Sequence, residues 1–456
     1  MIEPKAPYNM NAMLATDWYK ISHWEQYPAD TEYVYSNWTA RSSHVPGQFT
    51  VVNFGFTYFA KVYLDRFFKE RFFAMPYGEI EQEYRAVLKA GLGLINPKMD
   101  HVRALHELQY LPLRFYSIPE GFSTALNCPQ MVVVNTRPEF FWLTNFIESL
   151  MSCILWKPST SATTAQRYRK LFEKYALESG ETDLSFIDYQ GHDFSFRGMS
   201  GLEDAILSGL GHLTCFTGTD TIPAICAAHK YYGADYLVGQ SVPATEHSVM
   251  CSGTQDGEFD TFKRLITELY PTGIVSIVSD TWDLWKVLTD YIPQLREQIL
   301  ARDGKVVIRP DSGDPVKIMC GDPDSYGAAN FGVLRLLELA LGVDRDRVGL
   351  PLIQKAGAIY GDSITLERAD QILYRCTKEL KLSPYNAVFG IGSYTYEYVT
   401  RDTYGRAMKA TAVVRGGKLI PIFKAPKTDT GGKKSHKGIP AVELRSQLNQ
   451  ILSFTW

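Results

Sequence analysis

The stretch Val307-Ile308-Arg309-Pro310-Asp311-Ser312-Gly313-Asp314-Pro315 joins an apolar run to a polar turn. A strand that ends in a cation, a rigid turn, a carboxylate and small residues suits a phosphorylated sugar. The carboxylate can bind ribose hydroxyls or Mg²⁺, while the arginine and the backbone N–H groups can bind phosphate. A simpler interpretation is that Asp311 and Ser312 only cap the next helix. Capping alone, however, requires neither Arg309 nor a second carboxylate.

Similar units occur on both sides of this stretch. From about Asp183 onward, short β-branched or aromatic runs alternate with helical patterns at intervals of about 30 residues, which predicts βαβ units and a parallel sheet. Helices are expected over 259–269, 282–300, 331–341 and 364–380. The expected strands are residues 184–189, 213–216, 236–238, 273–278, 306–308, 350–353 and 387–389.

Polar residues follow nearly all of these expected strands. In a closed βα barrel the loops after the strands form one rim, and active sites are built there. An open doubly wound sheet would gather only a few such loops at its switch point. Seven strand ends with polar residues therefore favour an α/β fold of the barrel type. The runs are His192-Asp193-Phe194, Gly218-Thr219-Asp220, Glu246-His247, Asp280, Arg309 to Gly313, Gly361-Asp362 and Gly390-Ile391-Gly392-Ser393.

The composition excludes several classes of protein. The 456 residues have a formal net charge of -3, which gives no electrostatic case for binding nucleic acid or an anionic membrane. Seven scattered cysteines without a CxxC pair indicate reduced thiols in the cytoplasm and argue against a zinc site. The most apolar stretch, 140–156, contains Asn145 and Glu148 and predicts a buried helix. A second helix is expected at about 161–179.

Several candidate residues also have plain structural interpretations. A lone histidine such as His247 is more often structural, but its predicted strand end and the carboxylates at neighbouring ends favour an oriented imidazole. Asp220 could simply cap the following helix. Phe194 and Arg197 could stack on a planar ring and hold a phosphate, or merely pack a loop.

The end of the chain is rich in cations. A solvated face is the simpler explanation. The pair Gly431-Gly432 suggests a flexible loop that closes over a polyphosphate, and a final helix is expected after it. The cations are Arg401, Lys409, Lys424, Lys427, Lys433, Lys434 and Lys437.

Taken together, these segments resemble the nicotinamide phosphoribosyltransferases, in order and over nearly the whole chain. The sister nicotinate enzymes share some of the same elements. The matching segments are Leu14 to Lys20, Pro119-Glu120-Gly121, Trp142 to Asn145, His192-Asp193-Phe194, Gly218 to Thr221, Ser241 to Ser248, Val278-Ser279-Asp280 and Ile308 to Gly313.

The resemblance implies an irregular (β/α) barrel of the type II phosphoribosyltransferase kind, over residues 181–394. A second, mixed α/β domain is built from both chain ends, 1–180 with 395–456. The family forms homodimers with active sites at the interface. Its substrates are nicotinamide and phosphoribosyl pyrophosphate, with ATP as co-substrate and Mg²⁺ as cofactor.

The resemblance also assigns residues to the substrates. Phe194 would stack on one face of the nicotinamide ring, and Tyr19 of the partner subunit on the other. Asp17 would also bind substrate. Asp220 would accept a hydrogen bond from the amide. The remaining substrate and phosphate residues are Arg197 and Arg309 in the pocket, Asp311 and Asp362 at the ribose, Gly392 and Ser393 at the 5′-phosphate, and Arg41, Arg401, Lys409 and Lys424 around the pyrophosphate and nucleotide.

The catalytic assignments come from the same resemblance. His247 would be phosphorylated by ATP, Asp280 would orient its imidazole, and Glu246 would assist phosphoryl transfer. Mg²⁺ would lie beside Asp311 at the pyrophosphate. Two segments, 355–363 and 390–394, depart from the family's glycine-rich phosphate loops.

Two rival functions remain. A nicotinate enzyme is disfavoured because Asp220 would repel a carboxylate substrate at contact distance. A non-catalytic nucleotide-binding barrel has no need of a phosphorylatable His247.

Overall fold

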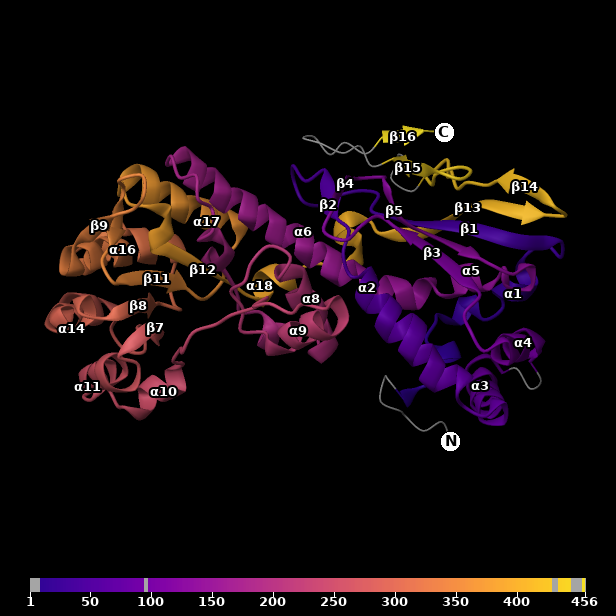
Figure 1. The fold of residues 1–456 in the computed structure, drawn as a ribbon, viewed down its shortest axis with the longest axis horizontal. Helices are drawn as coiled ribbons and strands as arrows, with labels where there is room; N and C mark the ends of the chain where they lie inside the picture. The colour runs from indigo at the N-terminus through magenta and orange to yellow at the C-terminus, as the bar shows by residue number, and fades with distance from the viewer. Residues whose placement is uncertain (1–8, 94–96, 429–433, 444–452, 456) are drawn as a thin grey trace. The chain divides into compact units, whose positions relative to one another are not determined.

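A computed structural model of the chain describes residues 9–93, 97–428, 434–443 and 453–455 (Figure 1). The chain divides into two compact units. We call them the terminal unit, Met1–Thr160 with Val399–Trp456, and the parallel-sheet unit, Ser161–Tyr398. Among the described residues, no helix combines the length and apolar character that crossing a membrane requires. Residues 431–432 and most of the expected last helix lie outside the described residues.

A five-stranded parallel sheet organises the parallel-sheet unit, in which all neighbouring strands pair in parallel. The sheet forms a half-barrel. In spatial order its strands are β6 (Gly191–Asp193), β12 (Ala387–Ile391), β11 (Ala356–Tyr360), β8 (Asp303–Arg309) and β7 (Thr272–Val278). The strands predicted over 273–278, 306–308 and 387–389 are confirmed, within β7, β8 and β12.

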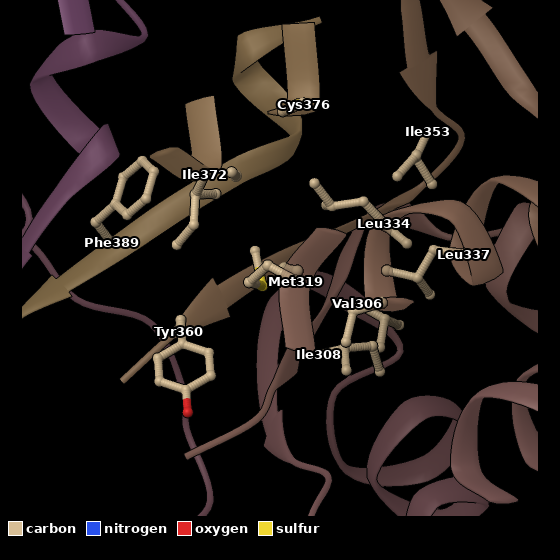
Figure 2. Packing of buried hydrophobic residues seen from close by; sticks show 14 of the residues in the cluster. Val306, Ile308, Met319, Leu334, Leu337, Ile353, Tyr360, Ile372, Cys376 and Phe389 are labelled. Atoms are coloured by element: carbon tan, nitrogen blue, oxygen red, sulfur yellow. The ribbon is translucent and has the colours of Figure 1, made fainter. Parts of the chain in front are cut away.

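Side chains alternate between the two faces of this sheet, because successive residues of a strand point in opposite directions. Val306 and Ile308 of β8 are fully buried on the face that packs against helices. Figure 2 shows them in one cluster with Leu334 and Leu337. Val307, between them, points to the other face and lines a cavity of ≈ 450 Å³.

All four predicted helical ranges of this unit are confirmed, although several are broken into short pieces. The helices over 259–269 and 364–380 each end in a π-helical turn, and in 282–300 a π-helical turn joins the pieces Leu284–Lys286 and Ile292–Gln294. The helices of the unit are α7 (Ile187–Gln190), α8 (Leu202–His212), α9 (Ile222–Ala227), α10 (His247–Ser252), α11 (Glu258–Arg264), α12 (Leu284–Lys286), α13 (Ile292–Gln294), α14 (Arg296–Leu300), α15 (Pro315–Cys320), α16 (Ala328–Leu341), α17 (Leu366–Tyr374) and α18 (Ser393–Tyr396).

Three predicted strands were wrong, and a fourth lies outside the parallel sheet. Residues 184–189 lead into α7, and residues 213–216 form the turn that follows α8. Residues 236–238 form no strand and are mostly exposed. Residues 350–353 belong to β10 (Pro351–Ile353), which pairs antiparallel with β9 (Val343–Arg345). After a tight turn at Lys355, β11 occupies the position beside β8 in the parallel sheet that was predicted for residues 350–353.

Single parallel bridges appear just beyond two of the three wrong strands, those predicted over 213–216 and 236–238. They join Asp193 to Thr219, Gly218 to Gln240, and Ala244 to Ser276. These bridges run from the β6 edge of the half-barrel toward its β7 edge.

The terminal unit is organised by a five-stranded antiparallel sheet that uses strands from both chain ends. β1 (Thr31–Thr39) lies at its centre. This strand was not predicted, because polar residues such as Ser36 and Asn37 interrupt its apolar pattern although both are buried. The other strands are β14 (Lys418–Pro421), β13 (Ala407–Arg415), β5 (Pro129–Asn135) and β3 (Leu113–Ser117), with two small pairs, β2 (Thr50–Val52) with β4 (Ser123–Ala125) and β15 (Ala441–Glu443) with β16 (Ser453–Thr455).

One long helix stands where two were expected. α6 (Glu148–Glu178) runs for 31 residues and continues through Pro158. Burial of Leu155 before the proline and Ala162 after it keeps the helix intact despite the lost hydrogen bond. The division between the two units falls within α6, after Thr160. The helices that lie wholly in the terminal unit are α1 (His23–Gln26), α2 (Phe56–Phe59), α3 (Tyr77–Leu92), α4 (Asp100–Leu108) and α5 (Leu143–Phe146).

Two glycines, Gly273 and Gly304, pair with each other at the start of β7 and β8. Substituting each of them tests how closely the two backbones approach. A Cβ at Gly304 would lie 1.9 Å from the carbonyl oxygen of Gly273, whereas a Cβ at Gly273 would meet nothing within 4 Å. Both have positive φ. We expect Gly273→Ala to cost about 1 kcal/mol and Gly304→Ala about 3 kcal/mol of stability in chemical denaturation. Equal losses would contradict the close approach of the two backbones.

Candidate active site at the carboxyl ends of the parallel strands

A cavity of ≈ 810 Å³ opens at the carboxyl ends of the parallel strands. Its walls come from the loops that follow β6, β8, β11 and β12 and from the segments around residues 220 and 245. Ten of the lining residues are ones that the sequence patterns singled out: Phe194, Arg197, Asp220, Glu246, Arg309, Asp311, Gly361, Asp362, Gly392 and Ser393.

Asp193 ties together two loops of the cavity. It is fully buried at the end of β6. One carboxylate oxygen accepts a hydrogen bond from Ser195 N at 2.9 Å, and the other accepts from the Thr221 hydroxyl at 2.8 Å. The loop that carries Phe194 and the loop that carries Asp220 are therefore held by the same carboxylate.

Phe194 offers an aromatic surface to the cavity. Its backbone N–H donates to Ile391 O at 3.0 Å, which fixes the residue between β6 and β12. The guanidinium carbon of Arg309 lies 5.9 Å from the centre of the ring. A planar ligand stacked on Phe194 would therefore lie beside a cation.

Asp220 is held as an ionised acceptor. Its Oδ1 is 2.9 Å from His192 Nε2 and accepts from the Ser241 hydroxyl at 2.5 Å. Partial burial by itself would raise the pKa of the Asp220 carboxyl, but these hydrogen bonds and the charges of His192 and Arg309 keep that pKa below its usual value.

Arg309 brings a buried donor to the same wall. Its Nη2 donates to Thr245 O at 2.8 Å. Its Nε is buried and, within the described part of the chain, has no hydrogen-bond acceptor. Burial lowers the pKa of the Arg309 guanidinium, while Asp311 and Asp220 act in the opposite direction. A buried N–H without an acceptor is costly, so the site suits a ligand oxygen at this position.

His247 lies among carboxylates at the start of α10. Its Nε2 is 3.8 Å from Asp311 Oδ2 and 4.0 Å from Asp280 Oδ1, and its Nδ1 is 3.3 Å from the Thr281 hydroxyl. Asp280 Oδ1 is buried and has no hydrogen-bond donor among the described residues. Glu246, the residue before His247, is exposed, and its carboxylate accepts a hydrogen bond from the Ser248 hydroxyl.

Asp280 also shapes the turn after β8. Its Oδ2 accepts from Asp311 N at 2.8 Å and from the Ser312 hydroxyl at 2.5 Å. The turn after β8 is therefore fastened to the end of β7. This contact places Asp311 beside His247.

The ribose and phosphate candidates also line the cavity. Asp362 follows β11 and accepts from the Ser363 hydroxyl at 2.7 Å. Gly392 and Ser393 follow β12 at the start of α18. Arg197 lies in the short helix after β6 and also lines the cavity.

The remaining candidates belong to the terminal unit. Tyr19 is exposed, and Asp17 accepts from the Ser149 hydroxyl at 2.5 Å. Arg41 and Lys409 line a separate cavity of ≈ 250 Å³ together with Lys434 and His436. Burial lowers the pKa of Lys409, and the charges of Arg41 and Lys424 lower it further, although Glu148 opposes them. Arg401 is an exposed residue paired with Asp402 at 3.0 Å.

No group of three or more histidine, cysteine, aspartate or glutamate side chains among the described residues could hold a metal by itself. Asp311 nevertheless presents a carboxylate to the cavity. This donor set fits Mg²⁺, which proteins commonly bind through one or two carboxylates together with substrate phosphates.

Several residues of the site were missed as functional candidates. Three of them are His192, Ser241 and Thr245, which lie in the segments His192-Asp193-Phe194 and Ser241 to Ser248. Their positions after predicted strands were the signal that could have identified them. His212 had no such signal, because it lies in an apolar helical pattern. It is fully buried, with Nδ1 2.7 Å from Tyr396 OH and Nε2 2.9 Å from Gly218 O.

Comparisons with known families agree with this geometry. Residues 189–453 match the nicotinate phosphoribosyltransferase (NAPRTase) family, and residues 11–70 match the nicotinamide phosphoribosyltransferase N-terminal domain. The chain belongs to the nicotinamide phosphoribosyltransferases of the NAPRTase family. The predicted resemblance is confirmed.

Two curated relatives are nicotinamide phosphoribosyltransferases. The one from Acinetobacter baylyi is 47% identical, over 96% of this chain and 89% of the relative. The one from Mycoplasma pneumoniae is 33% identical, over 92% of this chain and 93% of the relative. The similarity therefore extends through both units of the chain.

Solved structures support the fold. Nicotinate-nucleotide pyrophosphorylase from Pyrococcus furiosus matches with a TM-score of 0.56 at 15% identity, over 99% of this chain and 85% of that chain. Human nicotinic acid phosphoribosyltransferase matches with a TM-score of 0.53 at 17% identity, over 89% and 75%. The mixed α/β fold with a parallel half-barrel sheet is thus the type II phosphoribosyltransferase fold.

The buried carboxylate of Asp193 gives a test of how the site is held. Asp193→Ala leaves the Ser195 and Thr221 donors unpaired, so we expect a loss of about 3 kcal/mol in the free energy of unfolding. Asp193→Asn keeps one acceptor and should lose less. Asp256→Ala, at an exposed position of the same unit, is the control and should change stability by less than about 0.5 kcal/mol. Similar stability of Asp193→Ala and the control would mean that Asp193 does not hold the loops.

Proposed function

We propose that the cavity at the carboxyl ends of the parallel strands joins nicotinamide to phosphoribosyl pyrophosphate. As a member of its family, the chain is a pentosyltransferase of NAD salvage that forms nicotinamide mononucleotide and releases pyrophosphate. The observation that carries the assignment to this cavity is a matched donor and acceptor beside an aromatic face. They are the unpaired Nε–H of Arg309 and the ionised carboxylate of Asp220, next to Phe194.

These groups complement a primary carboxamide on a flat ring. The amide N–H₂ donates to Asp220, and the amide oxygen accepts from Arg309. The pyridine ring stacks on Phe194. Nicotinate would bring a second carboxylate against Asp220, and two like charges in contact within a cavity repel strongly. The pair therefore favours nicotinamide over nicotinate.

Other walls of the cavity suit the phosphorylated sugar. Asp311 and Asp362 are placed to accept hydrogen bonds from ribose hydroxyls, and Arg197 can pair with a phosphate. Gly392 and Ser393 present backbone N–H groups and a hydroxyl to the 5′-phosphate.

The chemistry needs positioning and charge neutralisation. The pyridine nitrogen forms a bond to C1 of the ribose while the bond from C1 to the pyrophosphate oxygen breaks, through an oxocarbenium-like state. The chain holds the ring and the sugar in line and stabilises the leaving charge with cations. Asp311 would hold Mg²⁺, which neutralises pyrophosphate when it is bound.

ATP coupling is assigned to His247. The imidazole accepts the γ-phosphoryl group of ATP, ADP leaves, and water later hydrolyses the phosphohistidine to release phosphate. Asp280 orients the ring and Glu246 assists the transfer. The placement of Asp280 supports this assignment, since Nε2 of His247 lies 4.0 Å from its Oδ1 and 3.8 Å from Asp311 Oδ2.

We further infer a homodimer and a closed barrel. Asp17 and Tyr19 of the partner subunit would complete the nicotinamide pocket, and Arg41, Arg401, Lys409 and Lys424 would hold the pyrophosphate and nucleotide. The domain made from 1–180 and 395–456 supplies these residues, and 181–394 forms the catalytic barrel. The three isolated bridges support closure of the half-barrel.

Product formation with phosphoribosyl pyrophosphate and Mg²⁺ tests the function, with nicotinamide and nicotinate offered side by side. The wild type should form nicotinamide mononucleotide and leave nicotinate unused. Asp220→Asn removes the charge that repels nicotinate, so it should reduce the preference for nicotinamide, measured as a ratio of kcat/KM, at least about tenfold. A wild-type preference for nicotinate, or an unchanged ratio in Asp220→Asn, would overturn the assignment of Asp220.

Phosphate labelling tests His247. Incubation with ATP labelled at the γ-phosphate should give the wild type an acid-labile label and raise its product yield. His247→Ala should acquire no label and lose the stimulation by ATP. His229→Gln, an exposed histidine of the same unit, should behave like the wild type. Labelling of His247→Ala at the wild-type level would place the phosphoryl acceptor elsewhere.

A further inference from the structure

His192 contacts the residue proposed to select the substrate. It is the middle residue of β6, its side chain is 13% exposed, and its Nε2 lies 2.9 Å from Asp220 Oδ1. The Ser241 hydroxyl donates to the same oxygen. Both contacts converge on Oδ1, so Oδ2 is the oxygen left for a substrate N–H group.

Arg309 exerts a competing attraction on Asp220. Its positive charge acts on the Asp220 carboxylate, and its own Nε–H lacks an acceptor among the described residues. Both residues line the same two cavities. A carboxylate free to rotate can turn toward the Nε–H of Arg309, since charge-assisted hydrogen bonds are strong in a partly buried site. The donor and the acceptor for the amide would then satisfy each other.

We propose that His192 is a specificity-positioning residue, which holds Asp220 through Oδ1 and keeps it apart from Arg309 so that both can bind the carboxamide. The proposal rests on the role of Asp220 given above. A protonated Nε2 of the imidazole donates to the carboxylate. His192 acts only through Asp220 and touches no reacting atom.

The imidazole ring of His192 is clamped from several sides. A Cβ at Gly218 would lie 2.8 Å from Nδ1, so only glycine leaves room for the ring there. The carbonyl of Gly218 is itself held by the buried His212. On the other side, the Phe194 ring centre lies 4.8 Å from that of His192. A clamped ring can hold a carboxylate in one orientation at little entropic cost.

Two substitutions separate the donor from the bulk of the side chain. His192→Ala removes the donor, whereas His192→Gln provides an uncharged amide N–H at about the reach of Nε2. We expect His192→Ala to raise the KM for nicotinamide about tenfold or more, with a much smaller change in kcat and an unchanged KM for phosphoribosyl pyrophosphate. Its preference for nicotinamide over nicotinate should fall. His192→Gln should recover most of both losses.

Gly218→Ala provides a second route to the same effect. The added methyl group would lie 2.8 Å from His192 Nδ1 and 3.0 Å from the carbonyl oxygen of Gly191. It displaces the imidazole without removing it, so a folded variant should also raise the KM for nicotinamide selectively. His229→Gln is the control for changing a histidine on this unit and should keep wild-type kinetics. Thermal unfolding of each variant identifies those that fold.

The outcomes distinguish this proposal from the proposed function. If Asp220→Asn changes the substrate preference but folded His192→Ala or His192→Gln show no selective change in KM for nicotinamide, the positioning role is wrong and Asp220 keeps its own. If Asp220→Asn has no effect on the substrate preference, the proposed role of Asp220 is wrong, and the positioning role of His192 is wrong with it. Equal losses for nicotinamide and phosphoribosyl pyrophosphate in His192→Ala, without rescue by glutamine, would indicate a merely structural histidine and overturn the proposal.

Discussion

Parallel hydrogen bonding between β8 and its two neighbours is the constraint on which the site depends. The register pairs Arg309 with Val278 of β7 and Ile308 with Ala358 of β11. Parallel strands end at the same edge of a sheet, so this register brings together loops that are far apart in the chain. Asp311 and Asp362 thus line one cavity, although each follows a different strand. Asp280, at the end of a third strand, accepts a hydrogen bond from the backbone N–H of Asp311.

Because side chains alternate along each strand, one face of the same sheet packs against helices and the other lines a cavity. The residues that face the helices, such as Val306 and Ile308, form the core, while Val307 and Arg309 point to the inner side. A change on the outer face acts on stability through packing. A change on the inner face alters the lining of a cavity, so the two effects can be measured apart.

The charged groups in and beside the cavity have hydrogen-bond partners that leave one donor or acceptor position of each group unused. Asp280 uses Oδ2 for the turn after β8 and leaves Oδ1 toward His247. Asp220 uses Oδ1 for His192 and Ser241, and Arg309 uses Nη2 for Thr245 O. Such half-satisfied groups are costly in a buried place, and a ligand that completes them recovers that cost. The open positions of Asp220 and Arg309 are an acceptor and a donor, which is the pattern that complements an amide under the proposed function.

Sequence patterns succeeded where a strand carries its own signal. β7, β8 and β12 have apolar runs bounded by polar turns, so their ends and the residues beyond them were predictable. β11 was missed because Ala356 to Tyr360 contains small residues, while the neighbouring run at 350–353 looked more like a strand of the sheet. β1 was missed because its buried polar residues are satisfied by partners elsewhere, such as Asn145 with Ser36.

By itself, the sequence determined the parallel strands with strong patterns, the polar runs after them and the family to which the chain belongs. These are local features, and the local order of residues is sufficient to encode them. Only the tertiary structure decided that single bridges replace two expected strands, and that His192, Ser241 and Asp220 meet at one oxygen atom. The physical reason is that such contacts join residues more than twenty positions apart, and their geometry depends on how the intervening helices pack.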